Sequence, residues 1–294
     1  MATSRTYLRT IQLSSSVNLF YREAGPASAP VILLLHGFPA SSFQFRNLIP
    51  LLAIKYRIIA PDLPGFGFTD MSSATNFIYT FANLANVIEE FVDALSLTKF
   101  SIYIFDYGAP TGLRLALKRP HAIQAIISQN GNVFEEGFGD VFWNDLRDYW
   151  STDINAAENR NALKKNALAL ESIKWQYEDG SPDLSRIAPE TYYLDYMLTT
   201  RPGIADAQLD LFWDYKDNIA NYPRFHEYFR TSQVPLLAVW GKNDQLFIPP
   251  GAQAYKRELP DAEVHLLDAG HFAVETNRED IADLILKFLS KQNI

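Results

Sequence analysis

The chain has 294 residues, and its 26 lysines and arginines against 34 aspartates and glutamates give a net charge of −8. This length fits one large α/β domain or two smaller ones, and 48% apolar residues can build a substantial core. The acidic balance argues against nucleic acid or an anionic membrane as a partner, since both attract clustered cations. The absence of cysteine excludes disulfide bonds, thiolate metal sites and a cysteine nucleophile.

The first 25 residues lack the apolar stretch of a signal peptide. Residues 31–35 form the longest early apolar run, which is far too short to cross a membrane. We therefore expect a cytoplasmic protein that neither crosses nor binds a membrane.

Short apolar runs alternate with helical patterns along much of the chain. Apolar residues recur every three or four positions between residues 77 and 95, which predicts an amphipathic helix, and a similar helix is expected at 281–289. The runs are typical of strands buried on both faces. They cover residues 31–35, 57–60, 100–105, 123–128, 234–240 and 264–267. This alternation predicts an α/β fold with a mostly parallel sheet flanked by helices.

Residues 133–225 differ from the rest, because they lack such runs and hold four of the five tryptophans. We predict a helical lid here, with breaks near 180–182 and 201–203. The core would then consist of residues 1–132 and 226–294. The predicted lid carries 9 basic and 17 acidic residues, which accounts for the whole net charge of −8.

Histidine is scarce, so an imidazole base has few candidates. His271 follows an apolar strand in a loop of small residues, where open α/β sheets place their sites. The other histidines are expected in structural or surface positions, apart from His36. His265, Asp268 and His271 could form a metal site only if they converged, and a strand-to-loop segment does not favour that.

No G-x-S-x-G motif is present, so a serine at a nucleophile elbow is not predicted. Instead, the strand that ends at Phe105 runs into Asp106-Tyr107-Gly108-Ala109 and then into a helical segment. An acidic residue at such a strand–turn–helix can be a nucleophile, or it can simply cap the helix. Polar turns also follow two other predicted strands, at residues 36–39 and 241–244.

Asp106, Asp244 and His271 occur in the order nucleophile, acid and base. Together with His-Gly-Phe-Pro at 36–39 and Asp-Leu-Pro-Gly-Phe-Gly at 62–67, they make the chain resemble the α/β-hydrolase superfamily. An aspartate at the elbow narrows the resemblance to epoxide hydrolases and to haloalkane and haloacetate dehalogenases. The resemblance implies an α/β-hydrolase fold with a helical lid, a reaction without cofactor or metal, and a small-molecule substrate.

The resemblance also assigns roles to residues. A carboxylate at position 106 can attack an sp³ carbon and form an alkyl ester, and His271, oriented by Asp244, would activate water against that ester. The backbone N–H groups of Phe38 and Tyr107 would form the oxyanion hole. His36, in the same loop as Phe38, is a further candidate for substrate binding.

Halide release needs N–H donors near the nucleophile. Haloalkane dehalogenases typically place tryptophan after the aspartate and often asparagine in the oxyanion loop, where this chain has Tyr107 and Phe38. Haloacetate dehalogenases hold the substrate carboxylate with arginines after the nucleophile. Tyr107 and Pro110 occupy that region here, and Arg114 is expected at the surface. The sequence therefore disfavours both halide reactions.

Epoxide opening needs acids that hydrogen-bond to the ring oxygen, and the family uses two lid tyrosines for this. Tyr149 and Tyr215 lie in the corresponding regions, although both could simply pack in an aromatic lid. Trp150 and Trp213 either line the pocket or pack within the lid. The alternative tyrosines are Tyr192, Tyr193 and Tyr196.

We therefore predict an epoxide hydrolase-like enzyme that converts a neutral, apolar epoxide to a diol. Dehalogenation, an esterase or lactonase that uses Asp106 as a base, and a small-ligand binder without activity remain the alternatives. The acidic lid favours neutral or cationic substrates over haloacids.

Overall fold

The computed structural model of the chain describes residues 5–71, 76–154 and 156–294. The first four residues of the segment considered above for a leader lie outside these ranges. Across the described part, no helix is both long and apolar enough to span a membrane.

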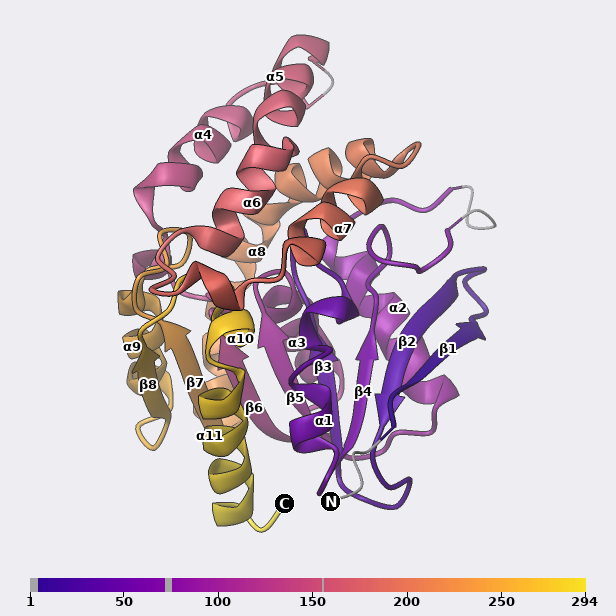
Figure 1. The fold of residues 1–294 in the computed structure, drawn as a ribbon, viewed down its shortest axis with the longest axis vertical. Coiled ribbons are helices and arrows are strands. Elements are labelled where there is room, and N and C mark those ends of the chain that lie inside the picture. Colours follow the sequence, from indigo (N-terminus) through magenta and orange to yellow (C-terminus); the bar gives the residue numbers. More distant parts are fainter. Residues whose placement is uncertain (1–4, 72–75, 155) are drawn as a thin grey trace.

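One sheet of eight strands forms the centre of the molecule, in the order β1-β2-β4-β3-β5-β6-β7-β8 (Figure 1). The strands from β4 to β8 in this order pair in parallel, whereas β2 pairs antiparallel with β1 and β4. The mostly parallel sheet that the sequence predicts is thereby confirmed. The strands are β1 (Tyr7–Gln12), β2 (Asn18–Ala24), β3 (Val31–Leu35), β4 (Arg57–Pro61), β5 (Phe100–Phe105), β6 (Ile123–Gln129), β7 (Leu236–Gly241) and β8 (Glu263–Leu267).

The hairpin of β1 and β2 was not among the predicted strands. β1 is largely exposed, so it lacks an apolar run. In β2, buried Leu19 and Tyr21 alternate with half-buried neighbours. This period of two is the pattern of a strand with one buried face, and it is visible in the sequence.

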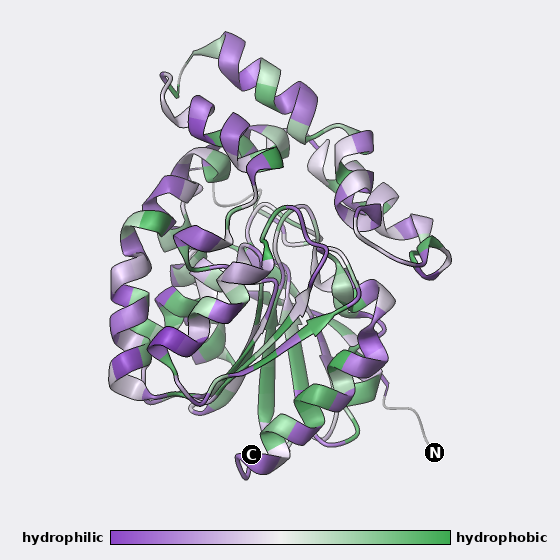
Figure 2. Cartoon of the chain, turned by 90° about the vertical axis from the view of Figure 1, so that its left-hand side faces the viewer, coloured by the Kyte–Doolittle hydropathy of each residue, from purple (hydrophilic) through white to green (hydrophobic). Residues whose placement is uncertain are grey.

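Helices cover both faces of the sheet, and Figure 2 shows the strands between them as its most apolar part. On one face, α1 (Ile49–Leu52), α10 (Ala273–Thr276) and α11 (Arg278–Lys291) pack in one hydrophobic cluster. On the other face, α2 (Phe81–Ala94), α3 (Gly108–Lys118) and α9 (Pro249–Glu258) pack in a second cluster. Short 3₁₀ turns occur at η1 (Ser42–Phe45), η2 (Glu135–Gly137) and η3 (Leu184–Arg186).

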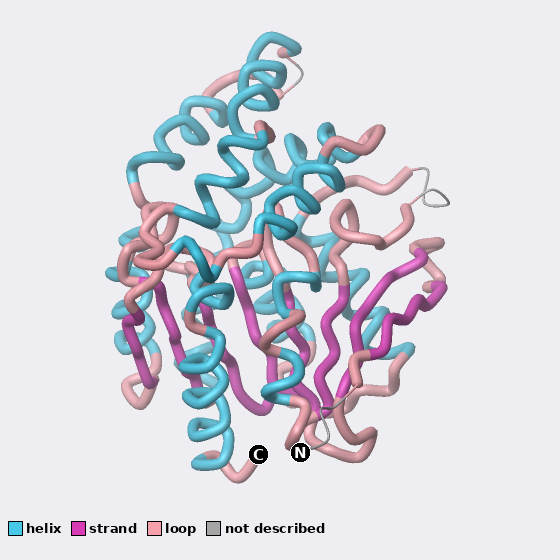
Figure 3. The backbone as a smooth tube through the Cα atoms, in the orientation of Figure 1, coloured by secondary structure: helices cyan, strands magenta, loops and turns pink. Residues whose placement is uncertain are grey.

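In the part of the chain that the structure describes, five α-helices connect β6 to β7, and we call them the inserted helices. They stand above the carboxyl ends of the strands (Figures 1 and 3). The last one runs through residue 225 without a break, so secondary structure marks no boundary there, and the division into core and lid stays a prediction. The inserted helices are α4 (Asp140–Trp150), α5 (Ala157–Ala167), α6 (Leu170–Glu178), α7 (Pro189–Thr199) and α8 (Ile204–Ser232).

Arg114 links the inserted helices to the layer below, which corrects the expectation that it lies at the surface. Its side chain is buried, and it donates hydrogen bonds from α3 to Asn218 at 2.6 Å and Asp217 at 2.7 Å on α8. The sequence pattern of α3 shows only a helix over the sheet. It does not show that α8 covers this helix.

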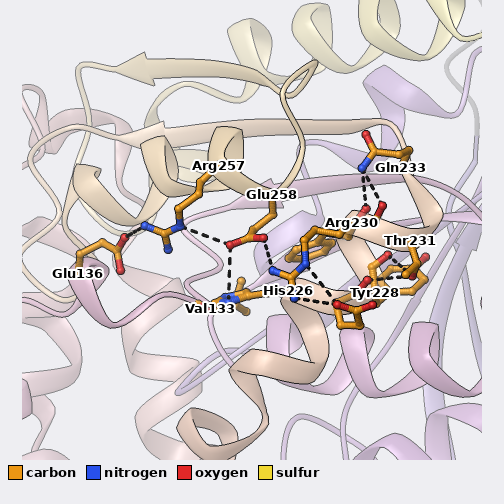
Figure 4. Close-up of polar contacts among 11 residues, drawn as sticks. Val133, Glu136, His226, Tyr228, Arg230, Thr231, Gln233, Arg257 and Glu258 are labelled. Carbon is orange, nitrogen blue, oxygen red and sulfur yellow. Dashed lines mark hydrogen bonds and ion pairs between the residues drawn. The ribbon is translucent and has the colours of Figure 1, made fainter.

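A second link joins both ends of the inserted segment to α9 (Figure 4). Glu258 on α9 is buried and accepts hydrogen bonds from Arg230 at 2.5 Å and Arg257 at 3.3 Å. Arg257 also donates to Glu136 at 2.5 Å, near the start of the segment. We call Glu258, Arg230, Arg257 and Glu136 the α9 ion cluster. Nearby, His226 donates from Nε2 to a backbone carbonyl at 2.8 Å, as a structural histidine does.

Candidate active site

The turn after β5 holds Asp106 in a strained conformation. Its φ is +46°, in the left-handed region that side chains other than glycine rarely adopt. A Cβ atom on Gly108 would lie 2.2 Å from the carbonyl oxygen of Leu35, so only glycine lets the elbow come this close to β3. The turn thus has the sharp geometry that presents a nucleophile above a sheet.

Backbone N–H groups hold the carboxylate of Asp106. Phe38 donates to Oδ1 at 2.6 Å, and the N–H of Tyr107 also hydrogen-bonds to the carboxylate. Burial raises the pKa of Asp106 to about 6, although the charge of His271 and these two N–H groups oppose the rise. The two predicted oxyanion donors therefore lie at the predicted nucleophile.

His271 and Asp244 form a buried pair. The Nδ1 atom of His271 lies 2.8 Å from Oδ2 of Asp244, whose Oδ1 accepts hydrogen bonds from the N–H groups of Leu246 and Phe247. Since Nδ1 donates to the carboxylate, Nε2 can act as the base, and it has no hydrogen-bond partner among the described residues. Burial lowers the pKa of His271, but the carboxylates of Asp244 and Asp106 raise it by more, so its pKa is above the ordinary value.

Asn130, which the sequence analysis missed, positions this pair. It follows β6 with a φ of +48° and donates from Nδ2 to Oδ2 of Asp244 at 2.6 Å. Its Oδ1 accepts a hydrogen bond from the N–H of Gly241 at 3.0 Å. Gln129-Asn130-Gly131-Asn132 is a polar turn after a predicted strand, which is the same signal that identified the other turns.

A cavity of about 20 Å³ lies beside Asp106, and it can hold about one water molecule. Six aromatic side chains line most of it. Gln176 on α6 also lines it, and this side chain is only 7% exposed and has no hydrogen bond with any described residue. The aromatic residues are Phe38, Tyr107, Phe142, Trp143, Phe212 and Phe247.

The two predicted acids lie at different places. Tyr149 does not line the cavity beside Asp106 as far as the structure describes it, and its hydroxyl has no hydrogen-bond partner among the described residues. Tyr215 is fully buried, and its ring lies 5.8 Å from that of Tyr107. Its pKa is well above the usual value because of burial, with smaller contributions from Tyr222 and the charge of Asp106. Tyr215 does not line the cavity beside Asp106 either, so the structure brings neither predicted acid to this cavity.

The remaining candidates make packing contacts. His36 is fully buried, with Nε2 accepting from the N–H of Leu63 at 2.9 Å and Nδ1 directed to the carbonyl of Gly37, so no contact supports its predicted binding role. Trp150 donates its indole N–H to a backbone carbonyl at 2.8 Å, and the ring of Trp213 lies under the ammonium group of Lys216 at 3.6 Å.

Among the described residues, no group of three or more histidine, aspartate or glutamate side chains is placed so that it could hold a metal ion. His265 and Asp268 are exposed by 41% and 60%, whereas His271 is buried. These three side chains do not converge, and Asp268 pairs with Lys242 instead.

A sequence profile described as alpha/beta hydrolase fold matches residues 30–278. The chain belongs to the alpha/beta hydrolase fold family. This family membership confirms the fold that the sequence predicts. The uncharacterized hydrolase YNR064C of Saccharomyces cerevisiae is 46% identical over 281 residues, which cover 96% of each chain. A haloalkane dehalogenase of Psychrobacter cryohalolentis is 36% identical over 117 residues, which cover 40% of this chain and 38% of that protein.

Solved structures of similar fold cover nearly the whole chain. The haloalkane dehalogenase DbeA from Bradyrhizobium elkani has a TM-score of 0.79 and 20% identity, covering 98% of this chain and 99% of that one. The epoxide hydrolase CorEH has a TM-score of 0.77 and 19% identity with the same coverage. At such identities the similarity establishes the fold alone. The family match and the 46% identical hydrolase of Saccharomyces cerevisiae together show that the chain is a hydrolase.

Proposed function

We propose that this alpha/beta hydrolase opens epoxides through an alkyl ester on Asp106. The observation that carries the proposal is the carboxylate itself, which occupies a strained elbow and receives the N–H of Phe38 at 2.6 Å. His271, supported by Asp244, supplies the base that an ester intermediate needs. A carboxylate at this position suits attack on an sp³ carbon, whereas acyl transfer is better served by a hydroxyl.

In the first step, the oxygen of Asp106 that does not bind Phe38 attacks an epoxide carbon. The new bond joins this oxygen to carbon, and the bond between that carbon and the ring oxygen breaks. The ring oxygen becomes an alkoxide, which takes a proton from a nearby acid. Of the two predicted acids we assign this role to Tyr215, because its ring lies 5.8 Å from that of Tyr107, next to the nucleophile. Tyr215 does not line the cavity, so its hydroxyl reaches the ring oxygen only after the surrounding side chains have moved.

In the second step, Nε2 of His271 takes a proton from water, and the resulting hydroxide attacks the ester carbonyl. The N–H groups of Phe38 and Tyr107 stabilise the oxyanion, which is worth about 3 kcal/mol per donor in comparable sites. Collapse of the intermediate breaks the bond between the carbonyl carbon and the alkyl oxygen. The departing diol oxygen takes the proton from His271. This leaves Asp106 as a carboxylic acid, which returns its proton to the acid that was deprotonated in the first step, so that both groups are regenerated.

The indole groups near the site favour an epoxide over a halide as substrate. Trp143 donates its N–H to the carbonyl of Leu246 at 2.8 Å, and Trp150 donates to that of Phe212 at 2.8 Å. Both indole donors are therefore used within the protein. Neither indole is therefore free to bind a departing halide, and among the described residues that line the cavity only the amide of Gln176 remains as a side-chain N–H donor.

The cavity beside Asp106 holds about 20 Å³, so an epoxide fits only after the side chains around it have moved apart. Phe142, Trp143 and Leu146 on α4 form one wall of this cavity. We infer that the inserted helices act as a lid, with α4 displaced when substrate enters.

Single turnover in ¹⁸O-labelled water tests the ester route. With enzyme in excess over an epoxide, the label should enter the carboxylate of Asp106 and be absent from the diol of the first turnover. Label in that first diol would mean direct attack by water and would overturn the proposal. A parallel assay of bromoalkanes should release no more free halide than buffer does, since halide release would assign the enzyme to dehalogenation instead.

A further inference from the structure

A second hollow lies next to the cavity beside Asp106, between α4, α5 and α6. Its volume is about 580 Å³, within the usual range of small-molecule sites. The two spaces share three lining residues, Phe142, Leu146 and Gln176. A molecule in the hollow would therefore have one end at the residues that border Asp106.

Gln176 is the feature of this junction that points to a ligand. As a residue it is only 7% exposed, but its amide is not among the fully buried side-chain atoms that lack a partner, so the amide is open to a molecule in these spaces. A side-chain amide can both donate and accept hydrogen bonds. Because Gln176 lines both spaces, a bound molecule that lies across the junction can accept and donate these hydrogen bonds.

The charges that line the hollow are all of one sign. Asp145 and Asp148 on α4 and Glu171 on α6 lie along it, and no lysine or arginine does so among the described residues. The lysines of α5, Lys164 and Lys165, line a neighbouring space that faces α7 and α8. The hollow therefore attracts cations and repels anions.

Apolar side chains make up the rest of the wall and suit an alkyl chain. Phe142, Leu146, Leu163 and Trp175 come from all three helices. An alkyl chain against these residues would bury apolar surface, and a polar end group would then face the acidic side chains.

We propose that this hollow binds the non-reacting part of an elongated, amphiphilic substrate with an uncharged or cationic tail, and that Gln176 hydrogen-bonds to the polar group next to the reacting carbon. The inference rests on the proposed function for the identity of the reacting end. It adds the tail, its charge and a positioning residue. Carboxylate-tailed epoxides of the same length would be poor substrates.

Equilibrium binding to the full chain tests the hollow without any turnover. Hexylammonium, hexane-1,2-diol and hexanoate share one alkyl chain and differ in the end group. Calorimetric titration should show the ammonium and the diol binding at least about tenfold more tightly than the carboxylate. Equal affinity for ammonium and carboxylate, or no binding of any of the three, would overturn the proposal.

Two triple variants locate the effect. Asp145→Asn, Asp148→Asn and Glu171→Gln together should remove most of the preference for hexylammonium over hexanoate. The matched control changes three exposed acids of the same segment that do not line the hollow, Glu135→Gln, Glu158→Gln and Glu190→Gln. This control alters net charge equally and should keep the preference. Equal loss in both variants would mean a long-range field rather than a site.

Gln176→Leu tests the positioning residue. This change removes the amide but keeps a side chain of similar size, so the melting temperature should change little, while affinity for hexane-1,2-diol falls about tenfold. Unchanged diol affinity would remove Gln176 from the site. All these measurements use ligands that do not react, so failure of the epoxide chemistry on Asp106 would be seen separately, in the labelling experiment.

Discussion

The ionised form of Asp106 is disfavoured by burial, and its hydrogen bonds and the charge of His271 only partly offset this. Burial raises its pKa to about 6 from an ordinary value of 3.8. The folded state therefore disfavours the charged form that a nucleophile needs. Its φ of +46° adds backbone strain. A residue that is unfavourable both as a charge and as a conformation is typical of a functional site rather than of a helix cap.

Replacing this charge should stabilise the protein. Asp106→Asn keeps the shape and tolerates a positive φ, and it should raise the free energy of unfolding at pH 8 by about 2–3 kcal/mol. The sign follows from the raised pKa, because the wild type loses stability as the pH rises from about 4 through about 6 and stays at the lower value above that. Urea unfolding at several pH values measures the difference between the two proteins.

The same variant should lose turnover by at least about 1,000-fold, since a neutral amide cannot form the ester. The stability gain should shrink as the pH falls from 6 toward 3, where the wild-type carboxyl group is mostly protonated in both the folded and the unfolded state. A gain that is independent of pH would mean that ionisation of Asp106 is not its source.

Ion pairs between residues far apart in the sequence join the inserted helices to the helices that cover the sheet. The α9 ion cluster has one buried member, Glu258, between Arg230 and Arg257, which are each about half exposed. α9 belongs to the helical layer on the sheet. The ion pair between Glu258 and Arg230 therefore joins the C-terminal end of α8 to this layer. Its loss should therefore affect stability more than the loss of a surface ion pair.

Glu258→Ala should lower the free energy of unfolding by about 1–3 kcal/mol. Glu227→Ala is the matched control, since Glu227 also pairs with Arg230 but is 62% exposed, and it should change stability by less than about 0.5 kcal/mol. Chemical denaturation of both variants checks the comparison. Equal effects would show that burial of Glu258 adds nothing to its ion pairs.

Elements with a clear local pattern could be predicted from the sequence, and those that depend on distant partners could not. The buried strands β3, β5 and β7 are continuous apolar runs, and the break before α8 is marked by Gly203. The prediction that the edge strand β8 is buried on both faces is wrong, because its residues are only half-buried or exposed. By contrast, β1 is exposed and is held by pairing with β2, which composition does not reveal. The buried position of Arg114 likewise depends on where α8 lies in space.

At the scale of the whole molecule, the sheet explains why the site residues could be found without a structure. Asp106, Asp244 and His271 follow β5, β7 and β8, whose carboxyl ends lie at one edge of a parallel sheet. A polar residue directly after a buried run is therefore a site candidate by position alone. The same rule would have found Asn130 after β6.

The residues of the inserted helices that line the cavity beside Asp106 could not be predicted from the sequence in this way. Gln176 and Phe212 come from helices whose directions are set by packing against one another. The sequence shows that these helices are amphipathic or aromatic, but it does not show which side chains face Asp106. For the same reason, Tyr149 and Tyr215 stay predictions for the acid.

The charge states of Asp106 and His271 predict how the two chemical steps respond to pH. Ester formation needs the ionised carboxylate, and its rate should fall tenfold per pH unit below about 6. Ester hydrolysis needs neutral His271, whose pKa is lowered by burial and raised by the carboxylate of Asp244, which stays charged in the ester; we expect this step to slow first as the pH falls from 8. Rapid quenching followed by mass spectrometry should find more ester at pH 6.5 than at pH 8.

The covalent ester on Asp106 is the claim on which the function rests, and trapping it is the most direct test. His271→Gln removes the base of the second step but leaves the nucleophile and its N–H donors in place. When this variant is mixed with an epoxide, peptide mass spectrometry should find the peptide that contains Asp106 heavier by the full mass of the epoxide. No adduct at Asp106, or continued diol production by the variant at the wild-type rate, would contradict the account.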